Sequence, residues 1–176
     1  MRKIGLVPLA SLKPGDNRFE LEGVARDYGL EIHEVRENPS FEELLGRIRV
    51  AVVITRSGKR FLVRGRVHFR ARLRCAICNE EYEQDFDEEL VAEFTMLERT
   101  GAAYARELEP EELDRVKIDA DFIDLSAVIH DAIHLAIPIA PRCREDCQGI
   151  CPVCGANRNL VRCGCELREK GTAAGG

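Results

Sequence analysis

Hydrophobic and polar residues alternate most regularly between Ile48 and Met96 of this 176-residue chain. The stretch contains the runs IRVAVVIT, FLVRGRVHFRARLRC and EYEQDFDEELVAEFTM, with turn residues at Ser57-Gly58 and at Asn79 between them. β-branched and aromatic residues at every second position, bounded by turn residues, are typical of strands joined by hairpins. The pattern therefore predicts an antiparallel meander of three strands.

Weaker patterns precede this meander. FELEGVA at 19–25 and LEIHEV at 30–35 alternate in the same way and predict two more strands. FEELLG at 41–46 instead predicts a short helix, because Ser40 can cap its first turn and Glu43 can complete a capping box.

Helical periodicity appears in IDLSAVIHDAIHLAIP at 123–138. Apolar residues recur there at helical spacing, namely at Leu125, Val128, Ile129, Ala132 and Ala136. Pro138 cannot continue a helix, so we expect a helix over 124–137. The charged, proline-containing stretch at 98–116 predicts a linker between the sheet and this helix.

These elements predict an α+β fold, with an antiparallel β-sheet body, few helices and a small C-terminal cysteine lobe that binds zinc. The chain is long enough for one ordinary hydrophobic core. We expect the body to span 1–138, the cysteine lobe 139–168 and a disordered tail 169–176.

Charge is distributed unevenly along the predicted meander, although the net charge is only −5. The middle strand carries basic residues at every second position, namely Arg64, Arg66, His68, Arg70, Arg72 and Arg74. Successive strand residues point to opposite faces, so these side chains share one face. The five arginines are candidate nucleic-acid contacts. Alternatively, they pair with acids of the next strand, which also recur at every second position from Glu81 to Asp87.

Six of the eight cysteines lie close together near the C-terminus, at Cys143, Cys147, Cys151, Cys154, Cys163 and Cys165. Two thiolates separated by two residues, as in CPVCG at 151–155, can bind one ion from a single turn. The other half of a tetrahedral site can come from Cys143 with Cys147 or from Cys163 with Cys165. The sequence therefore predicts one structural zinc ion bound by four of these six cysteines.

A second pair, Cys75-x-x-Cys78, lies at the predicted hairpin after the arginine strand. It can form half of a zinc site shared with two late cysteines, or it can be two small side chains in a tight turn. Because the late cluster already holds enough thiols for one ion, the sequence favours a zinc site without this pair.

The chain shows no catalytic motif. His130 and His134 are spaced as in the HExxH motif of zinc proteases, but Asp131 replaces the glutamate base and is too short for its role. No signal peptide and no apolar run of membrane-spanning length occurs. We therefore expect a non-enzymatic, cytoplasmic protein with no membrane or small-molecule partner, whose thiols stay reduced.

The hairpin CxxC, the segment IDLSAVIHDAIHLAIP and the late cysteines together resemble the YceD family, known as large-subunit ribosomal RNA accumulation proteins. The residues that carry the resemblance are Asp124, Leu125, Asp131, Leu135, Pro138, Gly149, Cys151, Cys154, Gly155 and Asn157. The resemblance implies a non-enzymatic factor for the synthesis, processing or stability of that RNA. Its partner would be ribosomal RNA or an assembling large subunit, contacted through the arginine face. Alternatively, the zinc lobe docks a ribosomal protein or another assembly factor.

Overall fold

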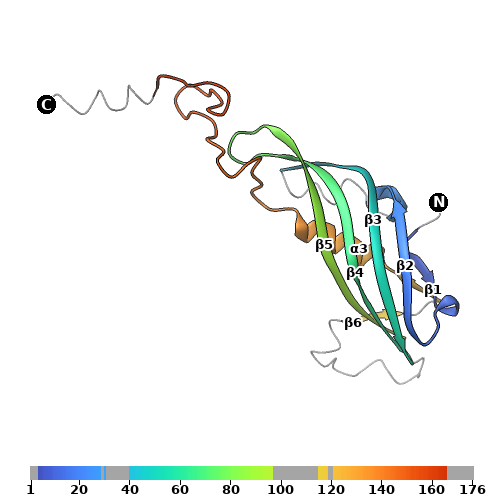
Figure 1. The fold of residues 1–176 in the computed structure, drawn as a ribbon. Coiled ribbons are helices and arrows are strands. Elements are labelled where there is room, and N and C mark those ends of the chain that lie inside the picture. Colours follow the sequence, from blue (N-terminus) through green and yellow to red (C-terminus); the bar gives the residue numbers. More distant parts are fainter. Residues whose placement is uncertain (1–3, 29, 31–39, 97–114, 119–120, 166–176) are drawn as a thin grey trace.

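The computed structural model describes residues 4–28, 30, 40–96, 115–118 and 121–165 (Figure 1). The described strands form a five-stranded sheet of order β2-β3-β4-β5-β6 and a two-stranded sheet of β1 and β7. The strands are β1 (Leu6–Pro8), β2 (Gly15–Gly23), β3 (Phe41–Ser57), β4 (Arg60–Arg74), β5 (Glu81–Met96), β6 (Arg115–Ile118) and β7 (Phe122–Asp124). The helices are the 3-10 turns η1 (Leu9–Ser11) and η2 (Ala25–Tyr28), and the α-helix α3 (Ser126–Ala136).

The predicted meander is confirmed by strands β3, β4 and β5. All neighbouring pairs from β2 to β5 are antiparallel, and β4 pairs with β5 without a break from Arg60 opposite Thr95 to Arg74 opposite Glu81. The expected strand at 19–25 is β2, whereas most of the one at 30–35 lies outside the described residues. The expected linker at 98–116 and tail at 169–176 also lie largely or wholly outside them.

The short helix expected at 41–46 is wrong, because this segment is the beginning of β3. Phe41 pairs with Leu73 of β4 and is buried, so the segment gains more from joining the sheet than from its capping signals. The β3–β4 register shifts between Leu45 and Arg49, and Gly46 lies there with a φ of +66°. The helix-like spacing therefore reflects a bulged strand.

The hydrophobic core lies between one face of the sheet and helix α3, which packs behind β4 and β5 (Figure 1). The inward-facing side chains of β4 and β5 are buried, namely Phe61, Val63, Val67, Phe69, Ala71, Leu73, Phe86, Leu90 and Phe94. Helix α3 confirms the prediction over 124–137 and contributes Ile129 and Ile133, which are fully buried. The Asp124 carboxylate accepts a hydrogen bond from the Ser126 N–H at 2.9 Å where the helix begins.

The α+β fold predicted from the sequence is confirmed. The tip of the β4–β5 hairpin extends beyond the core and lies next to the cysteine-bearing segment that follows α3 (Figure 1). Among the described residues, no helix is both long and apolar enough to cross a membrane.

Candidate metal centres

The turn between β4 and β5 holds Cys75 and Cys78 in a tight hydrogen-bonded loop. The Cys75 N–H donates to the Glu80 carbonyl at 2.9 Å, and the Asn79 N–H donates to the Cys75 carbonyl at 2.9 Å. Asn79 has a φ of +63°, a left-handed conformation that asparagine tolerates better than most residues. Both cysteines are buried.

The same turn occurs a second time, at Cys151 to Ala156. The Cys151 N–H donates to the Ala156 carbonyl at 2.8 Å, and the Gly155 N–H donates to the Cys151 carbonyl at 2.9 Å. Gly155 has a φ of +72° and occupies the place that asparagine occupies in the hairpin turn. The chain thus builds one CxxC turn twice, once on the sheet and once in the lobe.

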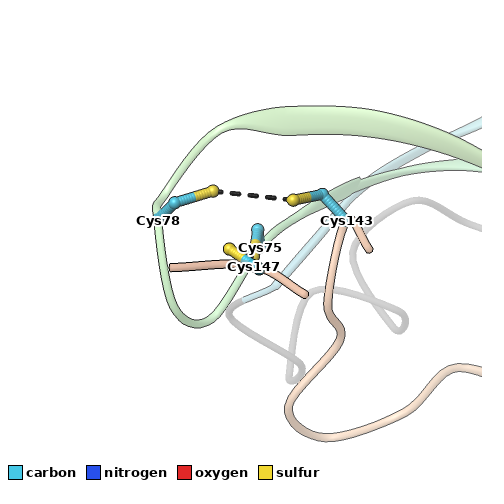
Figure 2. A group of neighbouring side chains, drawn as sticks. All are labelled: Cys75, Cys78, Cys143 and Cys147. Carbon is cyan, nitrogen blue, oxygen red and sulfur yellow. Dashed lines mark hydrogen bonds between the residues drawn. The ribbon is translucent and has the colours of Figure 1, made fainter. Parts of the chain in front are cut away.

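Four cysteines from the hairpin and the early lobe converge to form the first sulfur group, Cys75, Cys78, Cys143 and Cys147 (Figure 2). Their sulfur atoms all lie within 4.8 Å of one another. The Sγ atoms of Cys75 and Cys147 are 3.8 Å apart, and those of Cys78 and Cys143 are 3.7 Å apart. We call this set the clasp group.

The lobe alone supplies the second sulfur group, Cys151, Cys154, Cys163 and Cys165, whose sulfur atoms also lie within 4.8 Å of one another. Cys151 is buried, Cys154 is exposed, and Cys163 and Cys165 are half-buried. We call this set the lobe group. Each group offers four cysteine sulfur atoms, the number of ligands in a structural zinc site.

Hydrogen bonds divide the clasp group into thiols that ionise easily and thiols that do not. Burial disfavours the Cys75 thiolate, but hydrogen bonds from the backbone of Cys143, Cys78 and Ile77 outweigh it and lower the pKa of Cys75 to about 6. Burial and the neighbouring thiols of Cys78 and Cys75 raise the pKa of Cys143 to about 12. Backbone N–H groups that stabilise a thiolate also support it as a metal ligand.

The lobe group repeats this division. Hydrogen bonds from the backbone of Cys154 and Val153 lower the pKa of Cys151 to about 6. Hydrogen bonding with Cys154 and burial raise the pKa of Cys165 to about 12. In each group, therefore, backbone donors favour the thiolate of the first cysteine of the CxxC turn, and for Cys75 one of these donors is Cys143 from the other segment.

Side chains of the lobe also reach the sulfur atoms. Asn159 places its Nδ2 amide 3.4 Å from the Cys147 Sγ, and Arg158 places Nη2 3.8 Å from the Cys151 Sγ. Both are donors, and both favour a negatively charged sulfur.

The structure divides the six late cysteines differently from the single zinc site expected from the sequence. Cys163 and Cys165 complete the group of the CPVCG turn, whereas Cys143 and Cys147 join the hairpin pair. Cys75 and Cys78 thus lie together with two late cysteines, the grouping that the less favoured alternative requires. The sequence contains one signal of this division, because C-x-x-C followed by asparagine or glycine occurs twice and each copy can form half of a separate site.

The five candidate arginines line the exposed face of β4, as the alternation predicted, and four of them form ion pairs. Arg66 Nε lies 2.8 Å from Asp87 Oδ1, and Arg70 Nε lies 3.4 Å from Glu83 Oε2. Arg72 pairs with Glu43 and Glu83, and Arg74 pairs with Glu42 and Glu81. Within the described part of the chain, Arg64 forms no ion pair.

The two histidines of α3 do not take part in a metal-binding group among the described residues. The rings of His130 and His134 lie 4.2 Å apart between their centres, and both side chains are half-buried.

Comparison with known proteins identifies related sequences. A family model described as "Large ribosomal RNA subunit accumulation protein YceD" matches residues 63–172. A chloroplast protein of Arabidopsis thaliana, named as a large ribosomal RNA subunit accumulation protein YCED homolog 1, is 46% identical over 48 residues. An uncharacterized protein of Mycobacterium tuberculosis is 49% identical over 47 residues.

These alignments are short. The Arabidopsis alignment covers 27% of this chain and 15% of the relative, and the mycobacterial one covers 27% and 22%. A maize chloroplast protein with the same name as the Arabidopsis one is 44% identical over 48 residues, which cover 27% of this chain and 16% of the relative. No solved structure gives a significant match.

Proposed function

Because the chain belongs to the YceD family of large ribosomal RNA subunit accumulation proteins, we propose that it supports accumulation of large-subunit ribosomal RNA as a non-enzymatic binding factor. The names of the Arabidopsis and maize relatives describe this role for those proteins. The cysteine groups support the non-enzymatic part, since four thiolates close a tetrahedral site. Eight free thiols grouped in this way fit a reducing compartment such as the cytoplasm.

The metal of the lobe group is zinc in this proposal. Zinc prefers four thiolates in a tetrahedron, and CxxC turns with backbone donors to sulfur are typical of its structural sites. Bound zinc would hold the CPVCG turn against Cys163 and Cys165 and give the lobe a fixed surface. The ion has a structural role and takes part in no reaction.

We propose that the lobe uses this surface to dock a protein of the assembling large subunit. Five large apolar side chains of the lobe segment are exposed, namely Ile139, Ile150, Val153, Leu160 and Val161, with exposed fractions of 43% to 89%. Exposed apolar side chains lose their contact with water when a partner covers them, so they favour docking of a protein. The arginines of β4, in contrast, are largely paired with acids of their own sheet.

Direct contact with RNA is a second way in which the protein could bind the large subunit, and fewer residues support it. Arg64 and Arg18 both lie exposed in one row across the sheet, with Val53 between them, and neither forms an ion pair with a described residue. Phosphate groups attract such unpaired guanidinium groups. RNA contact through the exposed face would therefore centre on this row, while Arg66, Arg70, Arg72 and Arg74 are paired with acids of β3 and β5.

The function can be tested in cells that lack this protein, by measuring the ratio of large-subunit to small-subunit ribosomal RNA. We expect this ratio to fall in the deletion and to be restored by the wild-type chain. The double variant Leu160→Asp with Val161→Asp should fail to restore it, because it removes apolar contacts from the lobe surface. A normal ratio in the deletion would contradict the proposed function.

The matched control is Val91→Asp, which places the same charge at a valine of β5 that is 56% exposed, as Val161 is. This variant should restore the ratio as well as the wild type does. If it fails equally, the loss reflects a general effect of an added charge and the lobe surface is not the docking site.

Crosslinking in cells separates the two modes of binding. Docking through the lobe predicts protein crosslinks that survive nuclease treatment and are lost in the Leu160→Asp, Val161→Asp variant. RNA crosslinks that disappear in Arg18→Glu with Arg64→Glu, and persist in that lobe variant, would instead support the RNA mode.

A further inference from the structure

We propose that the clasp group binds a second zinc ion, which fastens the cysteine lobe to the tip of the β4–β5 hairpin. The four ligands come from two segments far apart in the sequence, two from the hairpin turn and two from the segment after α3. The inference concerns a separate site and stands independently of the role in ribosomal RNA accumulation.

Two sulfur–sulfur distances of the clasp group match those of a tetrahedron around zinc, and all four sulfur atoms lie within 4.8 Å of one another. With Zn–S distances of about 2.3 Å, the sulfur atoms of such a tetrahedron lie about 3.8 Å apart. The pairs Cys75 with Cys147 and Cys78 with Cys143 are separated by 3.8 Å and 3.7 Å between their Sγ atoms. A disulfide would need about 2.05 Å between the sulfur atoms, so these pairs are arranged as ligands of one ion.

The hairpin turn and the lobe turn share the same backbone hydrogen bonds and the same backbone conformation after the second cysteine. In both, the N–H of the first cysteine donates to the carbonyl five residues later, and a residue with left-handed backbone follows the second cysteine. Backbone donors lie against the first sulfur in both turns. A turn of this kind orients two thiolates toward one centre, so the hairpin can supply two of the four ligands of a zinc ion.

The apolar core of the sheet does not extend into the lobe. The hydrophobic core of the described residues ends at Ile137 and includes no residue of the segment 139–165. Hydrogen bonds cross the junction from the Ala76 N–H to the Pro141 carbonyl at 2.8 Å and from Asn157 Nδ2 to Glu80 Oε1 at 3.1 Å. A segment without its own apolar core depends on metal or on such bonds for its position.

The two segments approach each other closely beside the clasp group. Gly149 lies directly against Ile77, one of the two residues between the hairpin cysteines, and a Cβ at Gly149 would lie 2.7 Å from Ile77 Cγ2. The backbone of the lobe thus approaches the hairpin turn more closely than any other residue type would allow. This approach brings Cys147, two residues earlier, beside Cys75.

The site is tested by counting zinc ions on the full chain with native mass spectrometry, together with hydrogen exchange. The wild type should bind two ions. The variant Cys78→Ser with Cys143→Ser removes one ligand from each half of the clasp group and should bind one. Its amides in the hairpin turn and in residues 143–150 should lose protection, while those of the five-stranded sheet keep it.

The matched variant is Cys154→Ser with Cys165→Ser, which removes two ligands of the lobe group. It should also bind one ion, but the hairpin turn and residues 143–150 should remain protected. A single ion on the wild type, or two ions on the clasp variant, would overturn the proposal. The number of zinc ions on the wild type tests the proposal even if a variant does not fold. Whether that number is one or two, the expected ratio of ribosomal RNAs stays the same.

Discussion

Individual backbone conformations decide whether a CxxC turn can form. Gly155 follows the second cysteine of the lobe turn with a φ of +72°, and no atom within 4 Å would obstruct a side chain there. Any cost of a substitution therefore comes from the left-handed backbone and not from crowding. Asn79 meets the same requirement in the hairpin turn.

We predict that Gly155→Val weakens zinc binding by the lobe group about tenfold, since a β-branched residue pays about 1–2 kcal/mol in a left-handed conformation. The measurement is a competition titration with a chromophoric zinc chelator. Gly155→Asn is the matched control and should bind nearly as the wild type does, because asparagine serves in the hairpin turn. Equal affinities for the valine and wild-type proteins would show that the turn does not require this backbone.

The ion pair of Arg66 with Asp87 makes stability depend on pH. The hydrogen bond from Arg66, together with its charge and that of His68, lowers the pKa of the Asp87 carboxyl below its ordinary 3.8. A carboxyl with a lowered pKa in the folded state stabilises the fold above its unfolded pKa and loses this contribution as the pH falls through the folded pKa.

We therefore predict that Asp87→Asn lowers the urea midpoint at neutral pH, and that the difference from the wild type shrinks as the pH falls below about 4. The measurement is urea unfolding followed by circular dichroism at several pH values. A difference that stays constant down to about pH 2 would mean that Asp87 is not stabilised by ionic contacts.

At the scale of secondary-structure elements, the close approach of β3 and β4 depends on one position. Gly65 lies on β4 opposite Val52, and a Cβ there would lie 2.1 Å from the Ala51 carbonyl oxygen and 2.8 Å from the Val52 Cα. These are backbone atoms, which cannot move aside as a flexible side chain can.

We predict that Gly65→Ala destabilises the protein by about 1–3 kcal/mol, the usual cost of overpacking, by pushing the two strands apart. Chemical unfolding measures this change. The control Ala51→Gly, at the neighbouring exposed position of β3, should cost less because it adds no atoms. A Gly65→Ala protein as stable as the wild type would contradict the observed strand spacing.

The sequence was sufficient to predict those elements whose periodicity is strong and local. Alternation over β3, β4 and β5 and the helical spacing of α3 both led to the observed elements. The prediction was wrong at 41–46. Helix capping signals compete there with strand pairing to Leu73 and Ala71, which are distant in the sequence. The partner strand decides the outcome there, and a local pattern does not contain it.

The grouping of the candidate metal ligands also depends on contacts between residues that are distant in the sequence. Spacing identified every late cysteine, but it could not show that Cys143 and Cys147 lie beside a hairpin about 70 residues earlier, at sequence separations of 65 and 72. The arginines of β4 were placed on one face correctly, and their neighbours on β3 and β5 explain why most of them are neutralised.

At the scale of the whole molecule, a sheet with an apolar core is joined to a segment that has none. The division into a body over 1–138 and a lobe over 139–168 stays a prediction, as does the use of the lobe for docking. The difference in apolar burial nonetheless implies that the two parts respond differently to loss of metal.

We predict that a strong chelator removes the fold of the segment 139–165 while the sheet remains folded. The buried side chains Ile54, Phe61 and Leu73 do not depend on metal for their packing. Two-dimensional NMR should show the signals of the lobe collapsing to unfolded positions, with the sheet signals retained. Cooperative unfolding of the entire chain on chelation would contradict this division.

The central claim is that both cysteine groups are closed structural zinc sites. Zinc X-ray absorption spectroscopy on the fully loaded protein tests it most directly, because it reports the ligand atoms averaged over both sites. The account predicts four sulfur ligands per zinc at about 2.3 Å and no nitrogen or oxygen ligand. A spectrum that requires an oxygen or nitrogen ligand would contradict it, since an open or incomplete site would then be present.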